Sequence, residues 1–175
     1  MKRIIETFIG LLLIKMDFFI AKEEIVNSLN TTLGVVEKRQ TLPILSNVLF
    51  EVDELSLKLT ATDLESEILT VSTISNFKSG GKTTVPAKKI SELCRLLPEN
   101  SEIHIYLDGE SLKIETASGK YNLATLPSED FPVFDQEEAS SPINITSKNL
   151  KRLITKTSFA MGNQDWRHYL NGLYL

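Results

Sequence analysis

The feature that most constrains the fold of this chain is an internal repeat. Three stretches align as a short strand, a polar helix start and an apolar helix stripe: FIAKEEIVNSL (19–29), TVPAKKISELC (84–94) and NITSKNLKRLI (144–154). The aligned strand positions are Ile20, Val85 and Ile145, and the aligned helix positions are Ile25, Ile90 and Leu150. The unit recurs at offsets of 65 and then 60 residues. This regular spacing predicts a fold built from copies of one strand-helix unit.

Further runs between the predicted helices have strand character and turn residues at their ends. They are NVLFEV, LSLKLTATD and SEILTVSTI in the first unit, and EIHIYL, SLKIETA and KYNLATL in the second. Asp108-Gly109 and Ser118-Gly119 predict tight hairpins, and Gly80-Gly81 predicts a flexible hairpin connection. Each full unit is then one strand, one helix and three more strands. Two such βαβββ half-repeats predict an α+β fold, with two helices packed on antiparallel sheets.

The domain organisation follows from the repeat and from one change in composition. The two complete half-repeats predict a domain over residues 16–137, and the acidic stretch that follows predicts a linker at 138–142. The third unit, 143–175, opens with a strand and a helix and then has only a short segment, so it is expected to be the truncated start of a second domain. We expect 16–137 to fold alone, and 142–175 to expose an incomplete sheet edge and an apolar helix face liable to disorder or association.

The first 15 residues resemble a secretory signal, because a basic start precedes an apolar run. Glu6 interrupts that run, and Phe19 stands where cleavage after Ala21 needs a second small residue. Folded-domain patterning begins at Met16, so we interpret Met16 as the natural start and residues 1–15 as an upstream extension. Cys94 is the single cysteine, which excludes an internal disulfide and favours a reducing compartment. The prediction is a cytoplasmic protein with no membrane association.

No catalytic or metal site is predicted. SGGKTT (79–84) matches the end of a phosphate-binding loop but lacks its first glycine and continues as a strand. His104 alternates within a strand and His168 stands in a loop, and no carboxylate or second histidine has ligand spacing with either. Cys94 lies on the apolar side of the second helix, where a buried and inert thiol is expected. The sequence therefore predicts a protein that is not an enzyme and needs no cofactor.

Charge is unevenly distributed along this chain, whose net charge is −4. The third helix, predicted at 147–160, carries four cations and no acid: Lys148, Lys151, Arg152 and Lys156. The second helix carries Lys88, Lys89 and Arg95 against one acid, whereas the mostly β segment 98–138 has ten acids against two lysines. Cationic helices on an anionic molecule suit a nonspecific contact with a phosphate backbone. The alternative is a merely solvated helix face.

Two further segments combine residue types that bind nucleic acids. Lys38 and Arg39 end the first helix, where the helix dipole also favours cations for purely structural reasons. GNQDWRHYLNG (162–172) gathers an amide, a guanidinium, an imidazole and aromatic rings around a turn. Such residues either brace a loop or press on a sugar-phosphate backbone and stack on bases.

Five motifs, in their order and spacing, carry a family resemblance. They are RQTLPILSNVLFEV, LTATDLESE, TTVPAKKISELCRLLP, LPSEDFP and QDWRHYLNG. From Met16 to the last residue the chain resembles the bacterial DNA polymerase III beta subunits, the sliding clamps. The resemblance implies a clamp fold in a head-to-tail homodimeric ring, with helices lining the hole and sheets on the rim. It also implies a DNA replication processivity factor that encircles duplex DNA and tethers DNA polymerase III, as a non-catalytic subunit of that nucleotidyltransferase.

The resemblance implies roles for individual residues. Duplex DNA contacts are expected from Arg39, from Lys88 (usually arginine in the family), and from Gln164, His168 and Tyr169 in the loop; the cationic helix adds Lys148, Lys151 and Arg152. Leu170 corresponds to one wall of the pocket that receives peptides of DNA polymerase III and the clamp loader. Lys89, Lys120 and Tyr121 correspond to one half of the dimer interface.

The chain lacks counterparts of the rest of the second domain and of the third, so we do not expect it to close a ring alone. Two alternatives remain at this stage. One is a protein-interaction scaffold with the clamp fold that no longer binds DNA, and the other is a small exported enzyme.

Overall fold

The computed structural model describes residues 16–36, 42–133 and 144–174. The chain divides between residues 134 and 135 into two compact units, each of which is described by itself. The predicted linker and the boundaries next to it lie outside the described residues, as does the predicted upstream extension. Those bounds stay predictions.

The first unit contains two antiparallel sheets. One has the strand order β5-β1-β7-β8-β9 and the other the order β4-β3-β2-β6. The strands of the first sheet are β1 (Asp17–Ala21), β5 (Asn76–Ser79), β7 (Glu102–Asp108), β8 (Ser111–Thr116) and β9 (Gly119–Ala124). Those of the second are β2 (Asn47–Val52), β3 (Ser56–Thr62), β4 (Glu67–Thr73) and β6 (Gly81–Pro86). The predicted α+β class and the two βαβββ half-repeats are confirmed.

The two half-repeats exchange their first strands. β1 opens the first repeat but pairs with β7 of the second, with Phe18 opposite Ile105. β6 opens the second repeat but pairs with β2 of the first, with Val48 opposite Val85. Neither sheet of the unit is therefore built from one repeat alone, and the two repeats form one common core.

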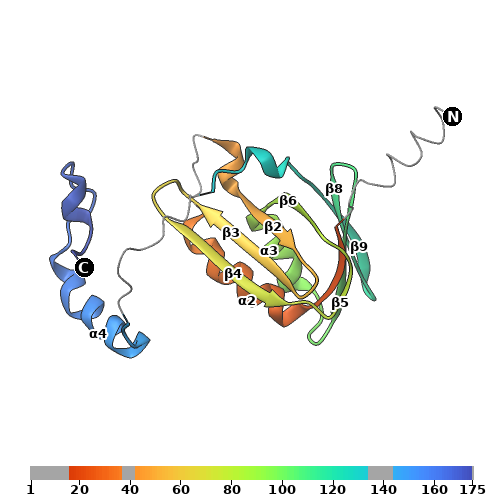
Figure 1. The fold of residues 1–175 in the computed structure, drawn as a ribbon, viewed down its shortest axis with the longest axis horizontal. Helices are drawn as coiled ribbons and strands as arrows, with labels where there is room; N and C mark the ends of the chain where they lie inside the picture. The colour runs from red at the N-terminus through yellow and green to blue at the C-terminus, as the bar shows by residue number, and fades with distance from the viewer. Residues whose placement is uncertain (1–15, 37–41, 134–143, 175) are drawn as a thin grey trace. The chain divides into compact units, whose positions relative to one another are not determined.

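Two helices pack side by side on one face of the β4-β3-β2-β6 sheet (Figure 1): α2 (Lys22–Thr32) and α3 (Ala87–Leu96). Their spacing of apolar residues turns one stripe of each helix inward. Ile25 and Leu29 of α2, and Ile90 and Cys94 of α3, are fully buried in the same cluster as the inward side chains of both sheets. The hydrophobic core thus lies between the helices and the sheets.

The connection at Gly80 differs from the predicted hairpin. β5 pairs with β1 in one sheet whereas β6 pairs with β2 in the other, so the chain crosses between sheets at Gly80. A Cβ atom at Gly80 would lie 2.7 Å from the carbonyl oxygen of Val52. The glycine therefore serves close backbone approach rather than flexibility. The hairpin prediction was wrong because a glycine pair has the same composition in a turn and at such a crossing.

The second unit is mainly helical over its described residues. It contains α4 (Ser147–Thr157) and the short 3-10 turns η4 (Ser158–Ala160) and η5 (His168–Asn171). The strand predicted before α4 is not formed, since residues 144–146 carry no strand. An extended segment becomes a strand only when a neighbour supplies hydrogen bonds, and none of the described residues of this unit does so.

Candidate nucleic-acid interface

Helix α4 presents a cationic face. The Thr146 side chain caps the helix, its Oγ1 accepting from the Asn149 amide at 3.4 Å. The exposed cations follow at spacings of three, one and four residues, which places them on one side of a 3.6-residue helix: Lys148, Lys151, Arg152 and Lys156. The structure leaves these four side chains open to a polyanion.

The other side of α4 is apolar and only partly covered. Leu153 is 45% exposed and Ile154 41% exposed. The predicted apolar helix face is thus present within the second unit, where it is separate from the cationic one.

The loop after α4 holds the other predicted DNA-contacting residues of this unit. Gln164, His168 and Tyr169 are all exposed, and Gln164 has a positive φ of 57°. Leu170, predicted for the peptide pocket, is half-buried, and its backbone closes the loop because Gly162 N donates to its carbonyl at 2.7 Å. These four residues belong to one short segment of the sequence, and this hydrogen bond closes that segment into a loop.

An ion pair inside this loop escaped the sequence analysis. The Asp165 carboxylate accepts from Arg167 Nε at 3.1 Å, from Arg167 Nη2 at 3.0 Å and from the Arg167 backbone amide at 2.9 Å. These hydrogen bonds lower the pKa of Asp165 and raise that of Arg167. The i, i+2 spacing of acid and base was visible in the sequence, but its turn geometry was not.

Helix α3 carries three cations of the first unit. Lys88 and Lys89 are exposed in its first turn. Arg95 is exposed in its last turn and donates from Nη2 to Asn30 of α2. Arg39, predicted to contact DNA, lies outside the described residues.

Acids stand on the exposed surfaces of the same two helices. Glu23 and Glu24 occupy the first turn of α2, and Glu92 lies on α3. Glu23 also accepts from the Asn100 backbone amide at 2.8 Å, which lowers the pKa of its carboxyl. The helices of the first unit are therefore mixed in charge, whereas the cations of α4 stand without an acid on their helix.

The predicted interface residues Lys120 and Tyr121 lie on β9, an edge strand of the five-stranded sheet. Lys120 is opposite Glu115 in the register and Tyr121 is opposite the buried Ile114, so the two side chains point to opposite faces. An edge strand carries free backbone groups that another strand can pair with. The open sheet edge thus carries both Lys120 and Tyr121. The third predicted interface residue, Lys89, is exposed on α3.

A row of paired polar and aromatic side chains crosses the outward face of this sheet. His104 Nε2 lies 2.7 Å from Asp17 Oδ1, and its ring stacks on Phe19 with centroids 4.3 Å apart. Lys78 Nζ lies 3.5 Å from the same Asp17 oxygen. The sequence analysis missed the Asp17 partner of His104, because the two residues are 87 positions apart and meet through the β1–β7 pairing.

A second group in the same row involves the edge strand. Glu115 accepts from Lys120 Nζ at 2.9 Å and from the Tyr106 hydroxyl at 3.0 Å. These contacts, Lys120 first, lower the pKa of Glu115, and in return the carboxylate raises the pKa of both Lys120 and Tyr106. The composition of residues 98–138 had suggested a uniformly acidic sheet face. Asp17 and Glu115 on this face are instead paired with partner side chains.

The part of the chain that the structure describes also bears on metal binding and on membrane insertion. It contains no group of three or more His, Cys, Asp or Glu side chains able to hold a metal ion. None of its helices is long and apolar enough to cross a membrane. Cys94 is fully buried, as predicted, and burial raises the pKa of its thiol to about 12.

Comparison with known proteins places these features in one family. The family profile described as "DNA polymerase III beta subunit, N-terminal domain" matches residues 16–135. The beta sliding clamp of Pseudomonas putida is 42% identical over 160 residues, which cover 91% of this chain and 44% of that protein. The beta sliding clamp of Escherichia coli K12 is 39% identical over 158 residues, covering 90% of this chain and 43% of that one.

Solved structures give the same result for the fold. The DNA polymerase III subunit beta of Pseudomonas aeruginosa superposes with a TM-score of 0.86 at 41% identity, covering 90% of this chain and 43% of that one. The Caulobacter crescentus protein superposes with a TM-score of 0.86 at 36% identity, covering 91% and 43%. The predicted clamp fold is confirmed. The chain spans less than half the length of the relatives that it matches.

Proposed function

Since this chain belongs to the DNA polymerase III beta subunit family, we propose that it serves as a DNA sliding clamp, a non-catalytic processivity factor in replication. The family match over residues 16–135 carries the proposal. In this role a closed ring surrounds duplex DNA and tethers DNA polymerase III without making or breaking a bond. The 175-residue chain spans less than half the length of its relatives, and we do not expect it to close that ring alone. Its place of action would be the cytoplasm.

The proposed DNA contact is made by exposed cations that do not read sequence. Lys148, Lys151 and Arg152 of α4 bind phosphates, with Lys88 of α3 and Arg39 adding to the same nonspecific attraction. Gln164, His168 and Tyr169 contact the sugar-phosphate backbone from the loop after α4. Two observations support this DNA contact. The proposed contact residues that the structure describes are exposed, and α4 carries no acid.

Other residues make the proposed protein contacts. Lys89, Lys120 and Tyr121 form one half of a homodimer interface, supported by the open edge of β9. Leu170 forms one wall of a pocket for peptides of DNA polymerase III and the clamp loader. One solved relative, a sliding clamp of Pseudomonas aeruginosa, is bound to griselimycin, which supports ligand binding by clamps of this family.

The DNA contact is tested by the salt dependence of binding to duplex DNA. We expect the logarithm of the association constant of the 175-residue chain to fall linearly with the logarithm of salt concentration, by about 0.9 per phosphate neutralised. Replacing Lys148, Lys151 and Arg152 by alanine should reduce the magnitude of this slope by about 2 to 3, at every duplex sequence alike.

A matched control removes the same charge from strands of the first unit. The triple variant K58A/K78A/K113A should retain the slope of the unmodified chain. A slope near zero for the unmodified chain would instead favour a clamp-fold scaffold that does not bind DNA. Equal effects of the two triple variants would show that DNA binding depends on the net charge of the chain and not on the cations of α4.

A further inference from the structure

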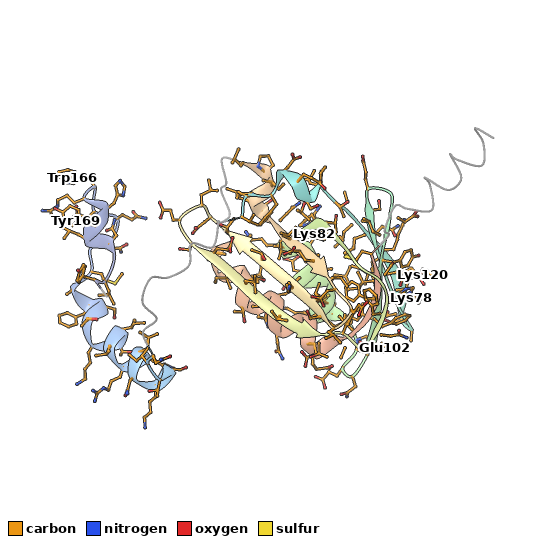
Figure 2. The ribbon with its side chains drawn as sticks, in the orientation of Figure 1. Lys78, Lys82, Glu102, Lys120, Trp166 and Tyr169 are labelled. Carbon is orange, nitrogen blue, oxygen red and sulfur yellow. The ribbon has the colours of Figure 1, made fainter. Side chains whose placement is uncertain are left out.

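The loop after α4 exposes two large aromatic side chains. Trp166 is 83% exposed and Tyr169 is 77% exposed, and Figure 2 shows both at one end of the second unit. Burial of aromatic rings is strongly favourable, so a tryptophan left in water to this extent suggests a surface that a ligand covers.

The loop that carries these rings is braced by its own hydrogen bonds. The Asn171 side chain accepts from Asp165 N at 3.0 Å and donates to Asp165 O at 2.9 Å. Gly162 N donates to Leu170 O at 2.7 Å, and the Asp165–Arg167 ion pair closes the turn around Trp166. A preformed loop loses little conformational entropy when a ligand binds.

The charge of the second unit selects the kind of ligand. Residues 144–174 contain five cations and one acid, Asp165, and that acid is engaged by Arg167. The Arg167 guanidinium carbon lies 5.8 Å from the centre of the Trp166 ring. Aromatic rings flanked by cations are the usual platform for nucleic-acid bases, which stack on the ring while phosphates meet the cations.

We propose that Trp166 is a base-stacking residue that takes one unpaired nucleobase of DNA. In a closed duplex the flat faces of the bases are covered by their neighbours, so Trp166 distinguishes single strands and junctions from fully paired DNA. This inference rests on the proposed function, which supplies the phosphate contacts of α4. It adds a preference for DNA with an unpaired end, which phosphate contacts alone do not give.

The chain carries its own reporter, because Trp166 is its one tryptophan. The 175-residue chain is titrated at low salt with three probes: oligo-dT, a blunt duplex, and the same duplex with an oligo-dT overhang. Binding is followed by the anisotropy of labelled DNA, and stacking by quenching of tryptophan fluorescence. We expect quenching by oligo-dT and by the overhang duplex, and none by the blunt duplex at equal saturation.

Three variants make the affinity test specific. Trp166→Ala should weaken binding to the overhang duplex by about five-fold or more and leave blunt-duplex binding unchanged, whereas Trp166→Phe should recover part of the loss. Phe159→Ala is the matched control, because Phe159 is 86% exposed in η4 of the same unit but outside the loop. It should bind all three probes like the unmodified chain.

The outcomes separate this inference from the proposed function. Salt-dependent binding of all probes without any fluorescence change, or equal quenching by blunt and overhang duplexes, would overturn the stacking role and leave the clamp proposal intact. An equal loss in Trp166→Ala and Phe159→Ala would also overturn it. Absence of binding to every probe at low salt would overturn both.

Discussion

Gly80 shows how a single missing side chain allows the chain to pass from one sheet to the other. We predict that Gly80→Ala lowers the free energy of unfolding by roughly 1–3 kcal/mol, because the new Cβ atom would meet the Val52 carbonyl oxygen at 2.7 Å. Gly34→Ala is the control, since its Cβ would meet only the Ile68 side chain at an ordinary 3.8 Å. Urea unfolding of both variants measures the difference. Equal midpoints for the two variants would show that the crossing has room for a methyl group.

Cys94 allows a prediction about pH. Burial raises the pKa of its thiol from 9.0 to about 12, so the folded state keeps the proton that the unfolded state releases. The stabilisation is full below the ordinary pKa and is lost as pH rises from about 9 to 12, by at most about 1.4 kcal/mol per pH unit. The difference in unfolding free energy between the unmodified chain and Cys94→Ala should therefore shrink over this range.

A thiol reagent gives a second measurement for Cys94. At pH 8 the native chain should react no faster than it opens, and the urea-unfolded chain should react at the rate of a free thiol. Fast labelling of the native chain would contradict a buried position for Cys94.

At the residue scale, local composition predicted burial but not partners. The apolar side of the second helix was enough to predict the buried Cys94. The Asp17–His104 contact depends on the register of β1 against β7, which joins strands from the two half-repeats. Sequence periodicity indicates which face a side chain takes, but not which distant side chain lies beside it.

At the scale of elements, helix α3 joins the common core through one buried stripe of side chains. Ile90 is fully buried in the common core, whereas Leu96 near the end of the same helix is 87% exposed. We predict that Ile90→Ala costs about 2–5 kcal/mol of unfolding free energy. Leu96→Ala should change it by no more than about 0.5 kcal/mol. Chemical denaturation followed by far-UV circular dichroism tests both, and a similar loss in the two would contradict the assignment of the buried face.

Elements were predictable where their own sequence decides them. The helices were found from their apolar spacing, and the strands of the two complete repeats from alternation between turns. Three features depend on other segments: the exchange of first strands between repeats, the short strand β5, and the failure of residues 144–146 to form a strand. All three features depend on which strands are neighbours in a sheet. The sequence of a single repeat does not determine those neighbours.

At the scale of the whole molecule, charge and core are divided between the two units. All residues of the described hydrophobic core cluster lie in the first unit, between Met16 and Ile114. The described part of the second unit has a cationic excess although the chain as a whole is anionic. The sequence was sufficient to locate this excess and the family motifs, whereas the mixed charge of the first unit became clear only from the placement of its acids.

This division predicts the behaviour of a chain ending at residue 137. No residue after 137 belongs to the described core cluster, so the shortened chain should unfold at the same urea concentration as the first unit of the full chain. Its DNA binding should change greatly, because five cations are removed while Lys88 and Lys89 remain beside acids of α2 and α3. The log-log salt slope should fall in magnitude by about 3 or more. If the shortened chain had the salt slope of the full chain, the DNA contact would have to lie in the first unit. A lower urea midpoint would mean that the second unit stabilises the first.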